Sequence, residues 1–244
     1  MLRLALLLLL ALTAGCFHHV ADYCTGCQVI DSTRLPPRPP TVPRGKRAVV
    51  ILVHGAFGFG DEWAPVVAAL RAAPEIHFVA FAWRGPWTRP DLAAHALTNL
   101  TQAYLDSAPP RTQQVLIIAH SAGGIIASYA VRHARVPDGR HLSLAKVAAF
   151  SLPLRLDMDY ERRINTPLGY AVGGTAKPIG DVPTGAEIVE YLTQDEHPLK
   201  PDALEGRAVF LGHDAGHNRV LGRVGLPLIA AARDGAPPLG AVVP

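Results

Sequence analysis

The sequence Q-V-L-I-I-A-H-S-A-G-G-I-I-A-S-Y-A-V at residues 114–131 decides the fold, because it predicts a buried strand that breaks at a serine and continues as a helix. The apolar run at its start is typical of a central parallel strand covered on both faces. Ser121 follows, and small residues surround it: Ala119, Gly123 and Gly124. A tight turn from strand to helix needs such residues, because larger side chains would collide with the neighbouring backbone. We therefore expect Ser121 to stand clear of the sheet, beside the N–H groups that begin a helix.

Strands and helices alternate along the rest of the chain. Besides the strand before Ser121, the predicted strands are residues 48–53, 76–82, 146–151, 188–193 and 207–211. The predicted helices are residues 61–73, residues 91–107, the helix from Ser121 to about Arg135, and residues 217–233. On the second helix, one buried stripe is expected from Leu92, Ala96, Leu100, Ala103 and Ser107. This order predicts the α/β class, with a mostly parallel sheet of about six strands and helices on both faces. Taken alone, Ser121 also fits a residue that only caps the helix of a βα unit.

The composition restricts the classes of protein to consider. Of 244 residues, 49% are hydrophobic and 18% are charged, which predicts one domain with a full core, at residues 48–233. The net charge of +3 and the lack of a basic, aromatic-rich stripe argue against nucleic acid as a partner. We find no sequence motif for a metal, a phosphate loop or a cofactor, so none is expected.

The N-terminus predicts export. Residues 1–15 combine one arginine, an apolar run and small residues, which is typical of a signal peptide too short to span a bilayer. The small residues before Cys16 resemble a bacterial lipobox, although Thr13 stands where leucine is more usual. That resemblance implies a lipid on Cys16 and a place in the cell envelope, at the outer membrane if the cell has one. The alternative is ordinary cleavage nearby, with Cys16 free or in a disulfide.

A tether is predicted between the anchor and the domain. Cys24 and Cys27 are spaced C-x-x-C, and in an exported chain we expect a disulfide between them in preference to a redox motif or half a zinc site. Proline and basic residues dominate residues 31–47, so residues 16–47 are expected to form an extended tether, resting on anionic lipid or simply solvated. Residues 234–244 are expected to be a loose tail.

Polar residues follow several predicted strands, at the edge where the ligands of parallel sheets bind. Ser121, an acidic residue and a histidine occur in that chain order, which is typical of α/β-hydrolases. From about Val49 to the closing helix the chain resembles this superfamily, and A-H-S-x-G-G is similar to small bacterial lipases with little or no lid. The resemblance implies ester cleavage by a nucleophilic Ser121 and a Ser-His-Asp triad. It also implies an oxyanion hole formed by the backbone N–H groups of Ala56 and Ala122.

The base and the acid have rival candidates. We favour His217 as the base, because it follows a short glycine-containing loop and opens the last helix, with His213 as the alternative. We favour Asp195 as the acid, because it follows a predicted strand in a D-x-x-P turn typical of the family. The other acids kept open are Glu196, Asp157 and Asp159. His54 and His120 are expected to be scaffold residues beside the site.

The apolar residues near the site suggest a substrate. Phe57, Phe59, Trp83 and Trp87 are expected to line a shallow groove, or else only to pack the loops. The segment between the fourth and fifth predicted strands is too short for a separate cap domain. The sequence therefore predicts a membrane-anchored hydrolase of short- to medium-chain esters. An acyltransferase, or a non-catalytic lipoprotein that binds a ligand or partner, remains an alternative.

Overall fold

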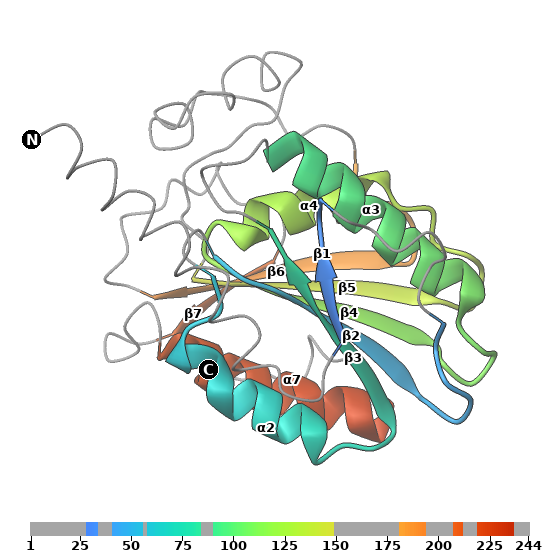
Figure 1. Ribbon diagram of the computed structural model, residues 1–244, viewed down its shortest axis with the longest axis horizontal. Coiled ribbons are helices and arrows are strands. Elements are labelled where there is room, and N and C mark those ends of the chain that lie inside the picture. The colour runs from blue at the N-terminus through green and yellow to red at the C-terminus, as the bar shows by residue number, and fades with distance from the viewer. Residues whose placement is uncertain are drawn as a thin grey trace, which may run out of the picture.

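In the computed structural model the strands form one sheet in which every neighbouring pair is parallel (Figure 1). The structure describes residues 28–33, 41–55, 58–83, 90–148, 181–193, 207–211 and 219–236. Its seven strands lie in the order β1-β3-β2-β4-β5-β6-β7. They are β1 (Gln28–Asp31), β2 (Ala48–Val53), β3 (Ile76–Ala82), β4 (Gln114–His120), β5 (His141–Val147), β6 (Ala186–Thr193) and β7 (Arg207–Leu211).

Helices cover both faces of this sheet. On one face lie α3 (Pro90–Ser107) and α4 (Gly123–His133); on the other lie the 3-10 helix η1 (Asp61–Trp63), α2 (Ala64–Arg71) and α7 (Val220–Asp234) (Figure 1). Every residue of β2 and β4 is buried, as expected of central strands with apolar side chains on both faces. The predicted α/β fold with helices on both faces is thereby confirmed.

The sheet begins earlier than predicted. Residues expected to belong to the tether form β1, an edge strand parallel to β3, in which Ile30 is 2% exposed. Val42, also in the expected tether, is buried in the same core cluster as Ile30. Short apolar stretches next to prolines and charges gave too weak a pattern to predict an edge strand.

Other boundaries also differ from the prediction. β5 begins at His141 and ends at Val147, so it lies several residues before the predicted strand at 146–151. On α3, Leu92 is 56% exposed, and the buried face is carried by residues such as Leu97 and Tyr104. The last helix ends at Asp234, so this residue, expected in the tail, belongs to α7. Among the helices that the structure describes, none combines the length and apolar character that crossing a bilayer requires.

Candidate active site

Ser121 lies at the junction of β4 and α4 with its backbone in the left-handed region. Its φ is 53°, a conformation that side chains with a Cβ rarely adopt and that is often kept at functional sites. Its N–H donates to the carbonyl of Val147 at the end of β5 (3.0 Å), and its carbonyl accepts from Gly124 (3.0 Å). These bonds hold the serine in a sharp turn between strand and helix, as predicted.

Two glycines make room for this turn. A Cβ on Gly55 would stand 3.0 Å from the Ser121 Cβ, so the loop after β2 lies directly against the serine. A Cβ on Gly123 would stand 2.4 Å from the His54 carbonyl oxygen and 2.8 Å from that of Val53. Because those neighbours are backbone atoms, only glycine fits at position 123 without a shift of β2 or α4. The first turn of α4 is therefore fixed against the end of β2.

His54 fixes the start of the loop after β2. Its Nδ1–H donates to the Gly55 carbonyl (2.6 Å), and its Nε2 accepts from the backbone N–H of Trp83 (3.0 Å). The Trp83 indole N–H donates to the His54 carbonyl (2.8 Å). Burial lowers the pKa of His54 from 6.5 to about 4, so the ring is neutral at physiological pH. Both ring nitrogens are occupied, which confirms His54 as a scaffold residue and excludes it as the general base in this arrangement.

Aromatic rings pack around His54. Phe59 lies edge-on to its ring (centroids 4.9 Å apart), and Trp83 stacks on it (5.8 Å, interplanar angle 14°). Trp63 lies edge-on to both Phe59 (5.0 Å) and His120 (6.3 Å). Phe59 and Trp83, expected at the mouth of the groove, are only 2% and 3% exposed. Their observed contacts thus support the loop after β2, as the packing alternative anticipated.

Of the two donors expected to form the oxyanion hole, Ala122 at the start of α4 is among the described residues. Ala122 is the N-cap of this helix and follows Ser121 directly, so its N–H lies at the positive end of the helix dipole. The second expected donor, Ala56, lies outside the described residues. Gly55 and Gly58, the described residues on either side of Ala56, pair with each other: the Gly58 N–H donates to the Gly55 carbonyl (3.4 Å). Gly58 has a φ of 96°.

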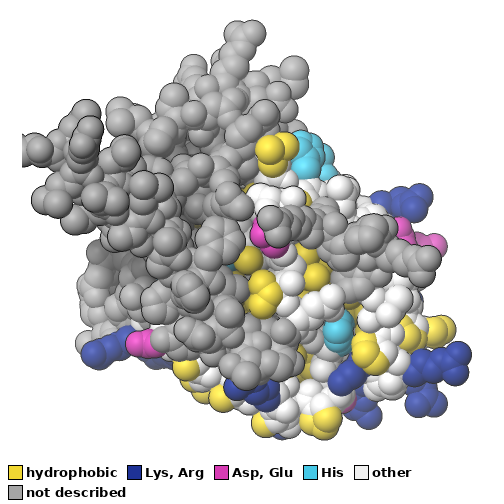
Figure 2. All heavy atoms as spheres, in the orientation of Figure 1, with side chains coloured by type: hydrophobic (Ala, Val, Ile, Leu, Met, Phe, Trp, Pro, Cys, Tyr) yellow, Lys and Arg dark blue, Asp and Glu magenta, His cyan; other side chains and the backbone are white. Residues whose placement is uncertain are grey.

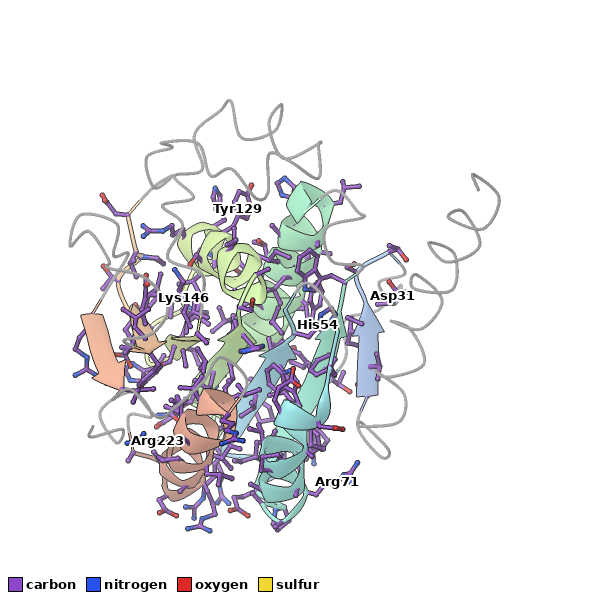
Figure 3. The ribbon with its side chains drawn as sticks, turned by 90° about the vertical axis from the view of Figure 1, so that its left-hand side faces the viewer. Asp31, His54, Arg71, Tyr129, Lys146 and Arg223 are labelled. Atoms are coloured by element: carbon purple, nitrogen blue, oxygen red, sulfur yellow. The ribbon has the colours of Figure 1, made fainter. Side chains whose placement is uncertain are left out.

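A buried ion pair, missed by the sequence prediction, lies next to this turn. Lys146 Nζ is 3.0 Å from Glu190 Oε1, across the paired strands β5 and β6, and the two residues are 7% and 2% exposed. Figure 3 places Lys146 beside α4. Lys146 also pairs in register with Ala119, two residues before the serine. The available signal was a lysine in one mostly apolar strand and glutamates in the next, and only the fold shows that Lys146 and Glu190 meet.

The other predicted residues lie outside the described residues. They are Asp195, His217, Phe57 and Trp87, the rivals Glu196, His213, Asp157 and Asp159, and the three cysteines Cys16, Cys24 and Cys27. The chain beside two of them is described: β6 ends at Thr193, and α7 begins at Val220. Val220 and Leu221 are fully buried in the core cluster that contains Trp63 and Phe59. Within the described ranges, no three His, Cys, Asp or Glu side chains gather as a metal site requires.

The fold and the turn define a class: an α/β protein with a parallel sheet and a serine in a strained turn at the carboxyl edge of its central strand. Residues 50–240 match the alpha/beta hydrolase family, and the chain belongs to that family. This membership supports a hydrolase. No curated protein sequence matches the chain.

Several solved structures share the fold. The type II thioesterase BorB from the borrelidin biosynthetic cluster is 18% identical, with 82% of this chain and 95% of that chain covered and a TM-score of 0.51. A putative thioesterase from Silicibacter sp. is 15% identical, with 90% of each chain covered and the same TM-score. An arylesterase is 15% identical, with 82% and 78% covered and a TM-score of 0.51. At these identities the likeness shows the fold alone.

Proposed function

We propose that this protein is a serine hydrolase that cleaves carboxylic esters with Ser121 as its nucleophile. The observation that carries the proposal is the left-handed backbone of Ser121 between β4 and α4, with Gly55 and Gly123 packed against the turn. A residue that only capped a helix would need neither the strain nor the two glycines. Such strain persists only where the surrounding structure enforces it, and it is concentrated at functional sites.

His217 is proposed as the base and Asp195 as the acid that orients it. His217 lies three residues before Val220, and a chain of three residues spans at most about 10 Å. Val220 belongs to the core cluster of Trp63, whose ring lies against His120, the residue before Ser121. Asp195 follows Thr193 by two residues in the sequence, and Thr193 ends β6 at the same edge of the sheet as Ser121. The occupied ring nitrogens of His54 leave the role of base to another histidine.

In the proposed reaction, His217 takes the proton of the Ser121 hydroxyl while the oxygen bonds to the ester carbonyl carbon. The carbonyl oxygen becomes an oxyanion, which the N–H groups of Ala122 and Ala56 stabilise; one such donor typically contributes about 3 kcal/mol. The intermediate expels the alcohol, which receives the proton from His217. Water then attacks the acyl-enzyme by the same steps and regenerates Ser121.

The direct test is covalent labelling with a fluorophosphonate. We expect the wild type to be labelled and Ser121→Ala to be unlabelled and inactive on p-nitrophenyl esters. Ser128→Ala is the matched control, because Ser128 is also buried on α4 and should keep full labelling. Labelling of Ser121→Ala at the wild-type level would show that the nucleophile is another residue.

The proposed substrates are soluble short- to medium-chain esters, bound in an open apolar groove that Phe57 and Trp87 help to line. We expect no jump in rate when the substrate forms an interface; a steep rise only above the solubility limit would refute this groove. Thioesters are included in the substrate series, since two proteins of this fold are called thioesterases. Transfer of the acyl group to an acceptor other than water would identify an acyltransferase. A wild type that the fluorophosphonate does not label would indicate a non-catalytic binding protein.

The enzyme is proposed to be exported and held in the cell envelope by a lipid on Cys16, with a disulfide between Cys24 and Cys27. The support is the signal-like N-terminus, which ends in small residues before Cys16. Cys16→Ser should move the protein from the membrane fraction to the soluble exported fraction. An unchanged membrane fraction would contradict the anchor without affecting the proposal for Ser121.

A further inference from the structure

A second cleft lies at the amino edge of the sheet, at the opposite end of β4 from Ser121. It has a volume of about 610 Å³, within the usual range of ligand sites, and Arg47, Arg111, Gln114 and His141 are among its lining residues. Arg47 directly precedes β2, Gln114 begins β4 and His141 begins β5. Lys and Arg side chains gather at the right-hand end of the molecule in Figure 2, where Figure 1 places this edge.

The walls of this cleft are held in place by two further cations. Lys46 Nζ donates to the carbonyls of Pro74 and Ile76, and the Thr112 hydroxyl donates to the Lys46 carbonyl (2.5 Å). The Arg140 guanidinium donates to the carbonyls of Ala108, Pro109 and Thr112. The loops before β2, β4 and β5 are thereby tied to one another, so the cleft is a built feature of the fold.

The two arginines that line the cleft are not used in this way. Arg47 and Arg111 are exposed, and no carboxylate of the described residues forms an ion pair with either of them. Two carboxylates lie near the cleft: Glu75, whose carbonyl accepts from the Arg47 N–H, and Asp234, which precedes the lining residue Gly235. Both face Arg233 (3.9 and 3.0 Å). The cleft therefore presents positive charge to solvent, and an anion would bind there favourably.

Gln114 is a buried lining residue of the same cleft. It is 8% exposed, and its Nε2 donates to the Ala236 carbonyl (2.9 Å). Its Oε1 is itself buried and has no hydrogen-bond partner among the residues that the structure describes. A ligand in the cleft therefore meets the exposed arginines and not this oxygen.

We propose that this cleft binds a phosphate group, with Arg47 and Arg111 facing its oxygens and His141 beside them. A guanidinium group presents its N–H donors in a planar fork that matches phosphate oxygens, and such charge-assisted hydrogen bonds are stronger than those between neutral groups. Inorganic phosphate and a phosphoglycerol headgroup both carry this group. Because the arginines recognise charge and shape, sulfate should bind about as well as phosphate.

The test is isothermal titration calorimetry of the full chain with three probes: inorganic phosphate, sulfate and glycerophosphoglycerol. We expect saturable binding of phosphate, and binding of sulfate within about twofold of it, because the two anions are similar in shape and charge. Tighter binding of glycerophosphoglycerol than of phosphate would identify a lipid headgroup as the ligand. Tighter binding of phosphate would identify free phosphate. No saturable binding of any probe up to about 10 mM would overturn the proposal.

Variants assign the site. Arg47→Gln and Arg111→Gln should each weaken phosphate binding by about fivefold, whereas Arg223→Gln, an exposed arginine on α7 (Figure 3), should leave it unchanged. Thermal unfolding of each variant checks that the fold persists. Equal loss of phosphate binding in Arg223→Gln would show a general charge effect and refute the cleft as the site.

Discussion

The polar groups at the two edges of the sheet differ in burial. At the carboxyl edge Ser121, His54 and the Lys146–Glu190 pair are all nearly buried, and the described polar contacts fix their geometry. At the amino edge Arg47 and Arg111 face solvent without a described ion pair. Buried, fixed groups suit catalysis, because they need no reorganisation when charge develops in the transition state. Exposed cations suit the binding of an anion from solution.

Both edges depend on the same strands. β2 and β4 run from the amino-edge cleft to the serine turn, and β2 pairs with β4 along its whole length, from Ala48 to Val53. The carboxyl edge gains its rigidity from short contacts between neighbouring strand ends, whereas the amino edge relies on long cationic side chains that donate to loop carbonyls. Substitutions at the two edges should therefore separate into effects on activity and effects on binding.

The largest predicted contrast concerns turnover. His217→Ala should lower kcat by about 10⁴-fold, as the loss of a triad base does, whereas Arg47→Gln at the other edge should leave kcat unchanged. Hydrolysis of a short p-nitrophenyl ester measures both. If His213→Ala is inactive and His217→Ala is active, His213 is the base.

The second prediction concerns the buried charges beside the serine turn. Glu190→Gln removes the carboxylate of the described Lys146–Glu190 ion pair and should reduce the free energy of unfolding by about 3 kcal/mol. The double variant Lys146→Met/Glu190→Leu removes both charges and should recover most of that loss. Urea unfolding measures all three proteins. A double variant as unstable as Glu190→Gln would show that the pair has a role beyond mutual neutralisation.

The third prediction concerns acid stability. The pKa of His54 is about 4 in the fold and 6.5 in the unfolded chain, so between these values the unfolded state binds a proton that the folded state does not. The contribution of His54 is therefore complete above pH 6.5 and is lost as the pH falls towards 4, by about 3 kcal/mol in total.

The comparison that isolates this effect is His54→Asn, because Asn can keep a donor near Nδ1 but does not titrate. The stability of the variant should fall less steeply between pH 6.5 and 4 than that of the wild type. His77, whose pKa is also lowered by burial and by Lys46, is common to both proteins, so its effect cancels. Parallel pH profiles would show that His54 does not carry the acid sensitivity.

The sequence predicted the central fold because the central strands are continuous apolar runs. β2 and β3 were predicted with their observed ends, since turn and helix signals bound them. β1 was missed and β5 was displaced, because an edge strand of four residues and a strand with polar positions give weak patterns. Leu92 was assigned to the wrong face of α3, because the small residues of this helix allow the buried stripe to be placed on more than one face.

The site was predictable only where local sequence sets the geometry. Ser121 and its glycines form one short motif, and the turn follows from sterics. The bond from the Trp83 N–H to His54 joins the residues that directly follow β3 and β2, and the Lys146–Glu190 pair joins β5 to β6. Their meeting depends on strand order and register, which no local pattern encodes.

The last prediction tests the carboxyl edge at its closest contact. Gly123→Ala would place a methyl group 2.4 Å from the His54 carbonyl oxygen, so α4 and the Ser121 turn must move away from β2. A displacement on the order of 1 Å at a catalytic group costs about 100-fold in rate, and we expect that loss in kcat. Gly222→Ala on α7 is the control, because its Cβ would meet only the Pro65 side chain at 3.1 Å. That control should retain activity within about twofold, since only a side chain needs to adjust there. Wild-type turnover in Gly123→Ala would mean that the serine turn tolerates a shift of α4, and that the edge is less rigid than its contacts imply.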